Sequence, residues 1–312
     1  MTVVVGVAPG HPAAAAVHLG ALLARSYGQP LVLAAITPAG WTPGGGGVDG
    51  EYQRFLASAA GEALAAVRVE CAEALADLTV RTAVHPASSA RRGLLDVCAA
   101  EDAVRLVIGA AGEPHAASGD GIVLGSVGIG LLQSAELPVG IAPHGFTAPA
   151  GARLDRITAA YNGSETSGEL VLGAAGVAAQ AGAGIRIASF HPRPRGLLGA
   201  AIGFGAEDAV IAEWETLIRD RAAGLDAEIA RLDPSPGSAE VVVGAGKDWH
   251  AALRAIPWGS AEVLLVGSSS VGALARISLG SHAAKIVRHA PVPVILVPRG
   301  AADEYAAHTS IT

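Results

Sequence analysis

The chain contains one strand–loop–helix–strand unit twice, and this repetition limits its fold more than any other feature. The second copy, Val263–Pro298, has an apolar run, a glycine- and serine-rich loop, a helix that starts near Gly280 and a second apolar run. The first copy is Leu106–Pro143, in which Gly125 is equivalent to Gly280 at an offset of 155 residues. A repeat of this length is a whole domain, because solenoid units are far shorter.

The length and the breaks between elements divide the chain into two domains. Its 312 residues suffice for two units of roughly 150 residues, each with its own core. We expect an N-terminal domain over residues 1–147, a C-terminal domain over 152–299 and a mobile tail over 300–312.

Short apolar runs without alternation predict strands that are covered on both faces, as in parallel sheets. Such runs alternate with helical segments along each half of the chain. The expected strands are 3–7, 31–36, 79–84, a run from 106, and 139–142, then 156–161, 185–190, 241–243, 263–266 and 294–297. The predicted fold class is therefore α/β, with two tandem five-stranded open parallel sheets and helices on both faces (Rossmann-like). Long helices are expected over 52–78 and 207–232.

Composition excludes several classes of protein. A formal charge of −7 argues against a sequence-independent nucleic-acid binder, which needs a basic surface. No run of 18 apolar residues predicts a membrane span, and the N-terminus lacks a signal-peptide pattern. Cys71 and Cys98 form no CxxC pair, so buried reduced thiols are expected. We expect a cytoplasmic protein without nucleic-acid or membrane partners.

The glycine-serine loop of each unit predicts an anion site. Backbone N–H groups at a helix N-terminus have no partner within the helix and attract phosphate. The loop is not a Walker A motif, because Ala273 stands where that motif requires lysine. Gly6 to Gly10 lacks the GxGxxG spacing of a dinucleotide site.

The pattern Gly-x2-Gly-x9-Gly-Ser after the fourth strand of such a domain resembles the universal stress protein family. The resemblance covers nearly the whole chain as two copies. It is most specific in LLVGSSSVGALARISLGSHAAKIVRHAPVPVILVPR, residues 264–299, and extends to ITAAYNGSE, residues 157–165. The resemblance implies an ATP site around the glycine loop, although members without the loop pattern bind no nucleotide.

The second domain matches this pattern better. Gly267 and Gly280-Ser281 have the expected separation, while Ser270 replaces the second glycine and Gly272 lies two residues later. The aspartate that follows the first strand in the family is Asn162 here, which can still hydrogen-bond a base or ribose.

The first domain departs further from the family. The corresponding residue is Ala8, and a longer loop carries Glu113 and Asp120, whose charges oppose a triphosphate. A weaker site is expected at the pattern residues Gly109, Gly112, Gly125 and Ser126.

The expected ligand is ATP, alone or with Mg²⁺, at the carboxyl ends of the second domain's strands. The phosphates would meet the glycine loop, and the nucleoside would lie near strand ends one to three. The expected contact residues are Ala160, Tyr161, Asn162, Gly163, Ser164, Ser189, Val243, Gly244, Gly267, Ser268, Ser269, Ser270, Gly272, Arg276, Gly280, Ser281 and His282.

Other interpretations of single residues stay open. Ser281 could hold phosphate or cap its helix, and Asp248 is a candidate N-cap. His282 is interpreted as a surface residue of its helix. The tryptophans are interpreted as packing residues.

The expected function is stress response or regulation through adenine-nucleotide binding. No GxSxG, HExxH or CxxC motif occurs, so ATP turnover is expected to be slow or absent. One alternative is a nucleotide-free scaffold that acts through protein contacts at the edge strands 139–142 and 294–297. A weaker alternative is an adenylyl-transferring enzyme. The resemblance implies that the edge strands pair as an intramolecular pseudo-dimer, and a homodimer stays open.

Overall fold

The computed structural model describes residues 1–39, 47–112, 121–192, 204–267 and 280–298. The first half contains β1 (Thr2–Gly6), α1 (Ala14–Ser26), β2 (Leu31–Pro38), α2 (Gly47–Glu70), α3 (Ala72–Leu75), β3 (Val80–Ala87), α4 (Ala90–Ala100), β4 (Ala103–Gly109), α5 (Ser126–Ser134) and β5 (Val139–Ala142). The second half contains β6 (Arg156–Ala160), α6 (Glu165–Ala181), β7 (Gly184–Pro192), α8 (Phe204–Ile229), β8 (Glu240–Gly246), α9 (Trp249–Arg254), β9 (Glu262–Gly267), α10 (Ser281–His289) and β10 (Val294–Val297). The predicted tail, 300–312, lies outside the described residues.

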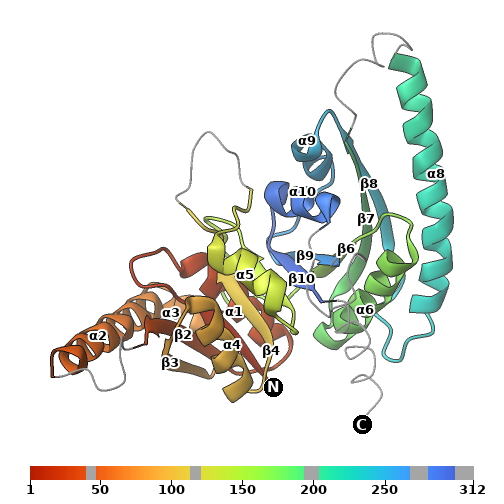
Figure 1. Cartoon of the computed structure of the whole chain (residues 1–312). Coiled ribbons are helices and arrows are strands. Elements are labelled where there is room, and N and C mark those ends of the chain that lie inside the picture. The colour runs from red at the N-terminus through yellow and green to blue at the C-terminus, as the bar shows by residue number, and fades with distance from the viewer. Residues whose placement is uncertain (40–46, 113–120, 193–203, 268–279, 299–312) are drawn as a thin grey trace.

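The strands form one ten-stranded sheet in the order β3-β2-β1-β4-β5-β10-β9-β6-β7-β8 (Figure 1). All pairs within each half are parallel, and the halves meet where β5 and β10 pair antiparallel, with Val294 opposite Ile141. The predicted α/β fold with five parallel strands per half is confirmed. The two sheets are joined edge to edge into one, so the strand pairing of a pseudo-dimer occurs within this chain.

Two apolar layers enclose the sheet. Successive side chains of one strand point to opposite faces, so Val3 and Val5 enter one core while Val4 enters the other. Helices α1, α2, α6 and α8 contribute to the first core, and α4, α5, α9 and α10 contribute to the second. In both halves, the same face of the sheet is therefore covered by the equivalent helices.

Cys71 and Cys98 are free and buried, as predicted. Burial raises the pKa of the Cys98 thiol to about 12 and that of Cys71 to about 11. No helix in the described ranges combines the length and the apolar character that crossing a membrane requires.

Several element bounds differ from the sequence-based prediction, and two of these differences change how an element is interpreted. The single helix expected over 52–78 begins earlier, at Gly47, and is interrupted at Cys71 between α2 and α3. The strand expected to end at Val243 continues as β8 to Gly246, which pairs with Pro192 of β7. Gly244 to Gly246, which follow the predicted strand, are therefore part of the sheet.

Glycines allow α9 to pack closely on β8. A Cβ atom at Gly244 would lie 2.2 Å from the Ala252 carbonyl oxygen, and one at Gly246 would lie 2.6 Å from the Ala251 carbonyl carbon. Real Cβ atoms do not approach backbone so closely, so these glycines serve helix–strand packing.

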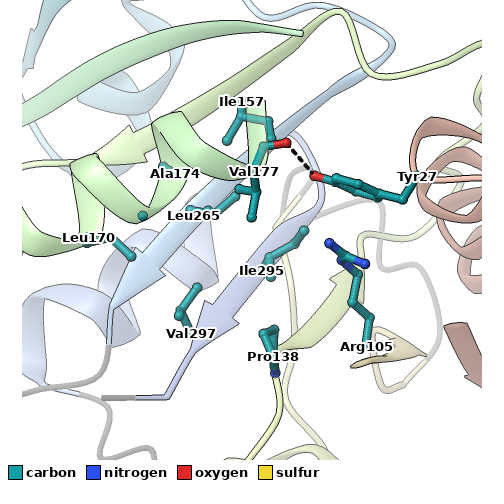
Figure 2. Close-up of a pocket in the computed structure, with 11 residues that line it drawn as sticks. Tyr27, Arg105, Pro138, Ile157, Leu170, Ala174, Val177, Leu265, Ile295 and Val297 are labelled. Carbon is teal, nitrogen blue, oxygen red and sulfur yellow. Dashed lines mark hydrogen bonds between the residues drawn. The ribbon is translucent and has the colours of Figure 1, made fainter. Parts of the chain in front are cut away.

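The end of α1 connects the two halves of the chain. Arg25 Nη1 donates to the Ala152 carbonyl at 3.0 Å, and Ser26 Oγ accepts from the Leu154 amide at 2.8 Å. Figure 2 shows the Tyr27 hydroxyl reaching α6, where it donates to the Val177 carbonyl at 3.2 Å. An apolar cavity of about 40 Å³ lies beside this contact, with Ile295 of β10 among its lining residues.

The Arg25–Asp77 ion pair predicts a pH dependence of stability. Arg25 donates to both Asp77 oxygens, at 2.8 and 2.6 Å, and lowers the pKa of that carboxyl from 3.8 to about 2. A carboxyl with a depressed pKa in the folded state stabilises it above the unfolded pKa, and this contribution is lost as pH falls. It should be complete above about pH 4 and disappear toward about pH 2.

Thermal unfolding of the wild type and of Asp77→Asn between pH 7 and pH 2 measures this contribution. The variant should melt at a lower temperature at pH 7, and the two melting temperatures should converge toward pH 2. Asp96→Asn, which removes the exposed helical pair with Arg92, serves as the control and should change the pH profile less. A constant difference between wild type and Asp77→Asn across this range would contradict the assignment.

Candidate functional site

A cavity of about 670 Å³ lies over the carboxyl ends of β6, β7 and β9 in the second half. Its volume falls in the range of roughly 300–1,000 Å³ that is typical of small-molecule sites. Residues from α6, α8, α9 and α10 complete its wall. The described lining residues are Ala160, Tyr161, Asn162, Ser164, Thr166, Ser167, Leu170, Ser189, Phe190, His191, Pro192, Trp214, Trp249, Val266, Gly267, Gly280, His282, Ala283 and Ile286.

The cavity gathers many of the residues expected to contact nucleotide. Those that line it are Ala160, Tyr161, Asn162, Ser164, Ser189, Gly267, Gly280 and His282. Those that are described but do not line it are Gly163, Val243, Gly244 and Ser281. The remaining expected residues, which lie outside the described ranges, are Ser268, Ser269, Ser270, Gly272 and Arg276. His282 is exposed, in agreement with its interpretation as a surface residue of its helix, and it also lines the cavity.

Each of the four described residues outside the lining has another place in the fold. Val243 and Gly244 lie within β8. Gly163 has a φ of +82°, and its carbonyl accepts a hydrogen bond from Arg221 Nη1 at 2.8 Å. Ser281 is the first residue of α10, whose N-cap is Gly280, so its hydroxyl does not take the capping role.

A network of hydrogen bonds orders the polar turn between β6 and α6. Asn162 Oδ1 accepts from the Ser164 amide at 3.0 Å and from the Ser164 hydroxyl at 2.7 Å. Ser164 is the N-cap of α6, and its side chain accepts from the Ser167 amide at 3.3 Å. Asn162 therefore shapes the turn through its side-chain oxygen, a role that the sequence-based reading did not assign.

The start of α10 directs backbone N–H donors toward the cavity, and these donors have no acceptor within the helix. Gly280, the N-cap, has φ −63° and ψ 161°, and among the described residues no side chain caps the helix. The first N–H groups of a helix have no intrahelical acceptor, and the helix dipole places partial positive charge there. Gly267 ends β9 on the same cavity, so the site can hold an anion between strand end and helix start.

Tyr161 adds a donor at neutral pH. Burial raises the pKa of its hydroxyl, although nearby Arg221 partly opposes the shift. The phenol therefore remains protonated in the physiological range. Tyr161 follows β6 directly, which brings it to the cavity beside Ala160.

Aromatic side chains of the cavity were not predicted as site residues. Trp214 and Trp249 were interpreted as packing residues, and Phe190 and His191 were not singled out, yet all four line the cavity. Trp249 could have been found, because it follows the carboxyl end of β8 after only two residues. Trp214 could not, because its position depends on how α8 packs across the sheet.

The first half has a smaller cavity of about 360 Å³ at the equivalent place. It brings together the residues Gly109, Gly112, Gly125 and Ser126. His11, Ser126 and His144 are the polar side chains among its described lining residues, which otherwise are apolar or glycine. The loop residues Glu113 and Asp120 lie outside the described ranges.

The described residues contain no group of three or more histidine, cysteine, aspartate or glutamate side chains arranged to hold a metal ion.

Comparison with known proteins gives a consistent result over the whole chain. The model of the Universal stress protein family matches residues 1–143 and 153–298. Universal stress proteins of Mycobacterium bovis and Mycobacterium tuberculosis are each 32% identical to the chain over 308 residues, with 96% of the chain and 100% of each relative covered.

Solved structures agree with this fold. A universal stress protein from Archaeoglobus fulgidus aligns with a TM-score of 0.58 at 18% identity, over 95% of this chain and 98% of that chain. A putative universal stress protein from Pseudomonas aeruginosa aligns with a TM-score of 0.56 at 15% identity, over 99% and 98%. The resemblance inferred from the glycine-loop pattern is confirmed by the family match in two tandem copies. The chain belongs to the universal stress protein family.

Proposed function

We propose that this chain is a cytoplasmic stress-response protein that binds adenine nucleotide, namely ATP, in the cavity of its second half. One observation carries the proposal. A single cavity collects the start of α10 with its glycine N-cap, the glycine that ends β9 and the polar turn before α6. The start of α10 and the glycine that ends β9 can bind a phosphate chain at one end of the cavity. The polar turn before α6 can bind a nucleoside at the other end.

The phosphates would lie against the start of α10. Backbone N–H groups and the helix dipole favour negative charge there. Glycine at position 267 leaves the backbone open to close approach, because the described atoms nearest to a Cβ there belong to Leu170, at 3.6 Å or more. Gly280 likewise has no side chain between its backbone and the cavity. The nucleoside would then face Asn162 and Ser189, with the Tyr161 hydroxyl as a further donor.

The lining favours binding over catalysis. Its described residues include no aspartate or glutamate, so none of them supplies a carboxylate to activate water or to ligate a metal. Any Mg²⁺ would be held by phosphate oxygens and water, which is a common arrangement for this ion. We therefore propose a sensor whose nucleotide occupancy changes its state, with slow ATP turnover or none.

The scaffold alternative loses its structural argument. It relied on β5 and β10 as exposed edges that seek partners. These strands pair with each other, through Val294–Ile141 and its neighbours. They are therefore not free to recruit another chain.

Thermal unfolding in the presence of ATP tests the proposal. A ligand that binds only the folded state stabilises it by about 2.7 kcal/mol at one hundred times its Kd. The melting temperature should therefore rise with ATP concentration and stay constant with added ribose. An unchanged melting temperature at millimolar ATP would reject nucleotide binding and favour a nucleotide-free role.

A further inference from the structure

Two pairs of aromatic side chains line the second-half cavity. Trp249 of α9 lies 5.4 Å from His282 of α10, measured between ring centroids. Trp214 of α8 lies 6.1 Å from His191 of β7, with the rings inclined by 32°. All four residues line the cavity.

The two tryptophans come from opposite layers of the fold. Trp214 packs against the core that α6 and α8 share, and Trp249 packs against the core of α9 and α10. Figure 1 shows α8 on one side of β7 and β8 and α9 with α10 on the other. The cavity thus has one aromatic wall on each side of the sheet.

The positions of these walls distinguish the two ends of the cavity. His282 is the second residue of α10, so the Trp249 wall borders the helix start where phosphate would lie. His191 is the second-last residue of β7 and lies two positions after Ser189, so the Trp214 wall borders the end proposed for the nucleoside. An aromatic side chain at that end can stack on the planar base of a nucleoside.

The indole N–H of Trp214 is a buried donor without an acceptor among the described residues. Its Nε1 atom is buried, and no hydrogen-bond partner lies within reach in that part of the chain. Leaving a buried donor unsatisfied costs about 1–3 kcal/mol, and most native donors find a partner. Trp258, by contrast, has a satisfied indole donor, because its Nε1 donates to the Leu253 carbonyl at 2.7 Å. A ligand with an acceptor atom would satisfy the Trp214 donor.

We propose that Trp214 recognises the base of the nucleotide, packing its indole against the ring system and donating its N–H to a ring acceptor. His191, near the end of β7, contacts the Trp214 ring and helps to hold the indole in place. This inference rests on the proposed function, because it takes the ligand to be a nucleotide. It adds that the second-half cavity selects nucleobase-containing ligands over inorganic polyphosphate.

Isothermal titration of wild type, Trp214→Phe and Trp214→Leu with ATP and with inorganic tripolyphosphate tests the assignment. Trp214→Phe keeps a ring and removes the N–H, so ATP should bind about tenfold more weakly, the equivalent of one hydrogen bond. Trp214→Leu also removes stacking, so the loss should reach about 100-fold. Tripolyphosphate affinity should stay within about twofold, because it makes no base contact.

The control is Leu217→Ala, on the same helix α8, 40% exposed and outside the described cavity lining. It should leave both affinities unchanged. ATP should also alter wild-type tryptophan emission. In Trp214→Phe this change should shrink to the part that comes from Trp249, the other tryptophan of the cavity wall. An undiminished change in Trp214→Phe would count against the assignment even if Trp214→Leu does not fold.

Unchanged ATP affinity in Trp214→Phe and Trp214→Leu would overturn this inference and leave the proposed function standing. An equal loss for ATP and tripolyphosphate would also overturn it, because the residue would then act on the cavity as a whole. Absence of ATP binding in the wild type would remove both proposals.

Discussion

Replacement of Glu262 by glutamine is expected to lower the free energy of unfolding by about 3–5 kcal/mol, because it leaves a buried arginine without its counter-charge. The side chains of Glu262 and Arg186 are both 0% exposed. Burial lowers the pKa of the Arg186 guanidinium, and the Glu262 carboxylate opposes that shift. Arginine keeps its proton in proteins, so the variant must retain a buried positive charge.

The surrounding hydrogen bonds make the carboxylate hard to replace. Glu262 accepts from Arg186 Nη2 and from the Thr158 hydroxyl, and its other oxygen accepts from the Gly259 amide at 2.9 Å. Arg186 also donates to the Pro257 carbonyl at 2.8 Å. The network links β6, β7 and β9 beneath the loop that leads into β9, so its loss affects the strands that carry the cavity.

Chemical denaturation of wild type, Glu262→Gln and Glu215→Gln measures the effect against a matched surface pair. Glu215 pairs with Arg219 one helical turn away on α8, with Arg219 54% exposed, and its loss should cost about 0–0.5 kcal/mol. Glu262→Leu combined with Arg186→Met removes both charges and should be more stable than Glu262→Gln alone. Equal destabilisation by Glu262→Gln and Glu215→Gln would show that the buried pair carries no special weight.

Substitution of Gly280 by aspartate is expected to weaken ATP binding by about 100-fold or more while leaving stability unchanged or slightly higher. Two charge-assisted hydrogen bonds to phosphate, at about 1.5 kcal/mol each, account for a loss of that size. Aspartate is a preferred N-cap that gains at most a few tenths of a kcal/mol over glycine. The φ of −63° at this position suits any residue. The same carboxylate that caps the helix repels the ligand.

Binding and unfolding measured on one set of variants separate these effects. Gly280→Asn has similar size and capping ability without the charge, so it should lose less affinity than Gly280→Asp. Ser126→Asp places a carboxylate at the start of α5, in the first-half cavity, and should leave ATP affinity unchanged. Wild-type affinity in Gly280→Asp would mean that phosphate does not lie at the start of α10.

The tandem fold could be predicted because its signals are local and repeated. Each half contains apolar strands without alternation of polar residues. Gly125 and Gly280 precede equivalent helices and are separated by the 155-residue repeat. The strand bounds at 294–297 agree with β10. The boundary between α2 and α3 was missed because Cys71 and its neighbours carry no residue that breaks a helix.

The site could be predicted where its residues lie near strand ends or at the helix start that the glycine-serine pattern marks. Asn162 and Gly267 meet the first condition and Gly280 meets the second, and all three line the cavity. Gly244 also follows an apolar run, but its lack of a side chain serves the packing of α9, and a sequence does not distinguish these two uses of glycine. Trp214 was missed because its contact depends on the packing of a helix that is far from the strand ends in sequence.

The buried pair Arg186–Glu262 was missed for a related reason. The two residues are 76 positions apart and lie near the starts of separate strands, where a charged residue usually indicates exposure to water. Their pairing follows from strand order, since β6 lies between β7 and β9 and supplies Thr158 as the bridge.

Isothermal titration of the wild-type 312-residue chain with ATP tests nucleotide binding itself. We expect one equivalent bound per chain, in the second-half cavity, and a loss of that binding in Gly280→Asp. Two equivalents would contradict the weaker rank given to the first half, and no heat of binding at millimolar ATP would contradict the proposal that this chain is a nucleotide-binding protein.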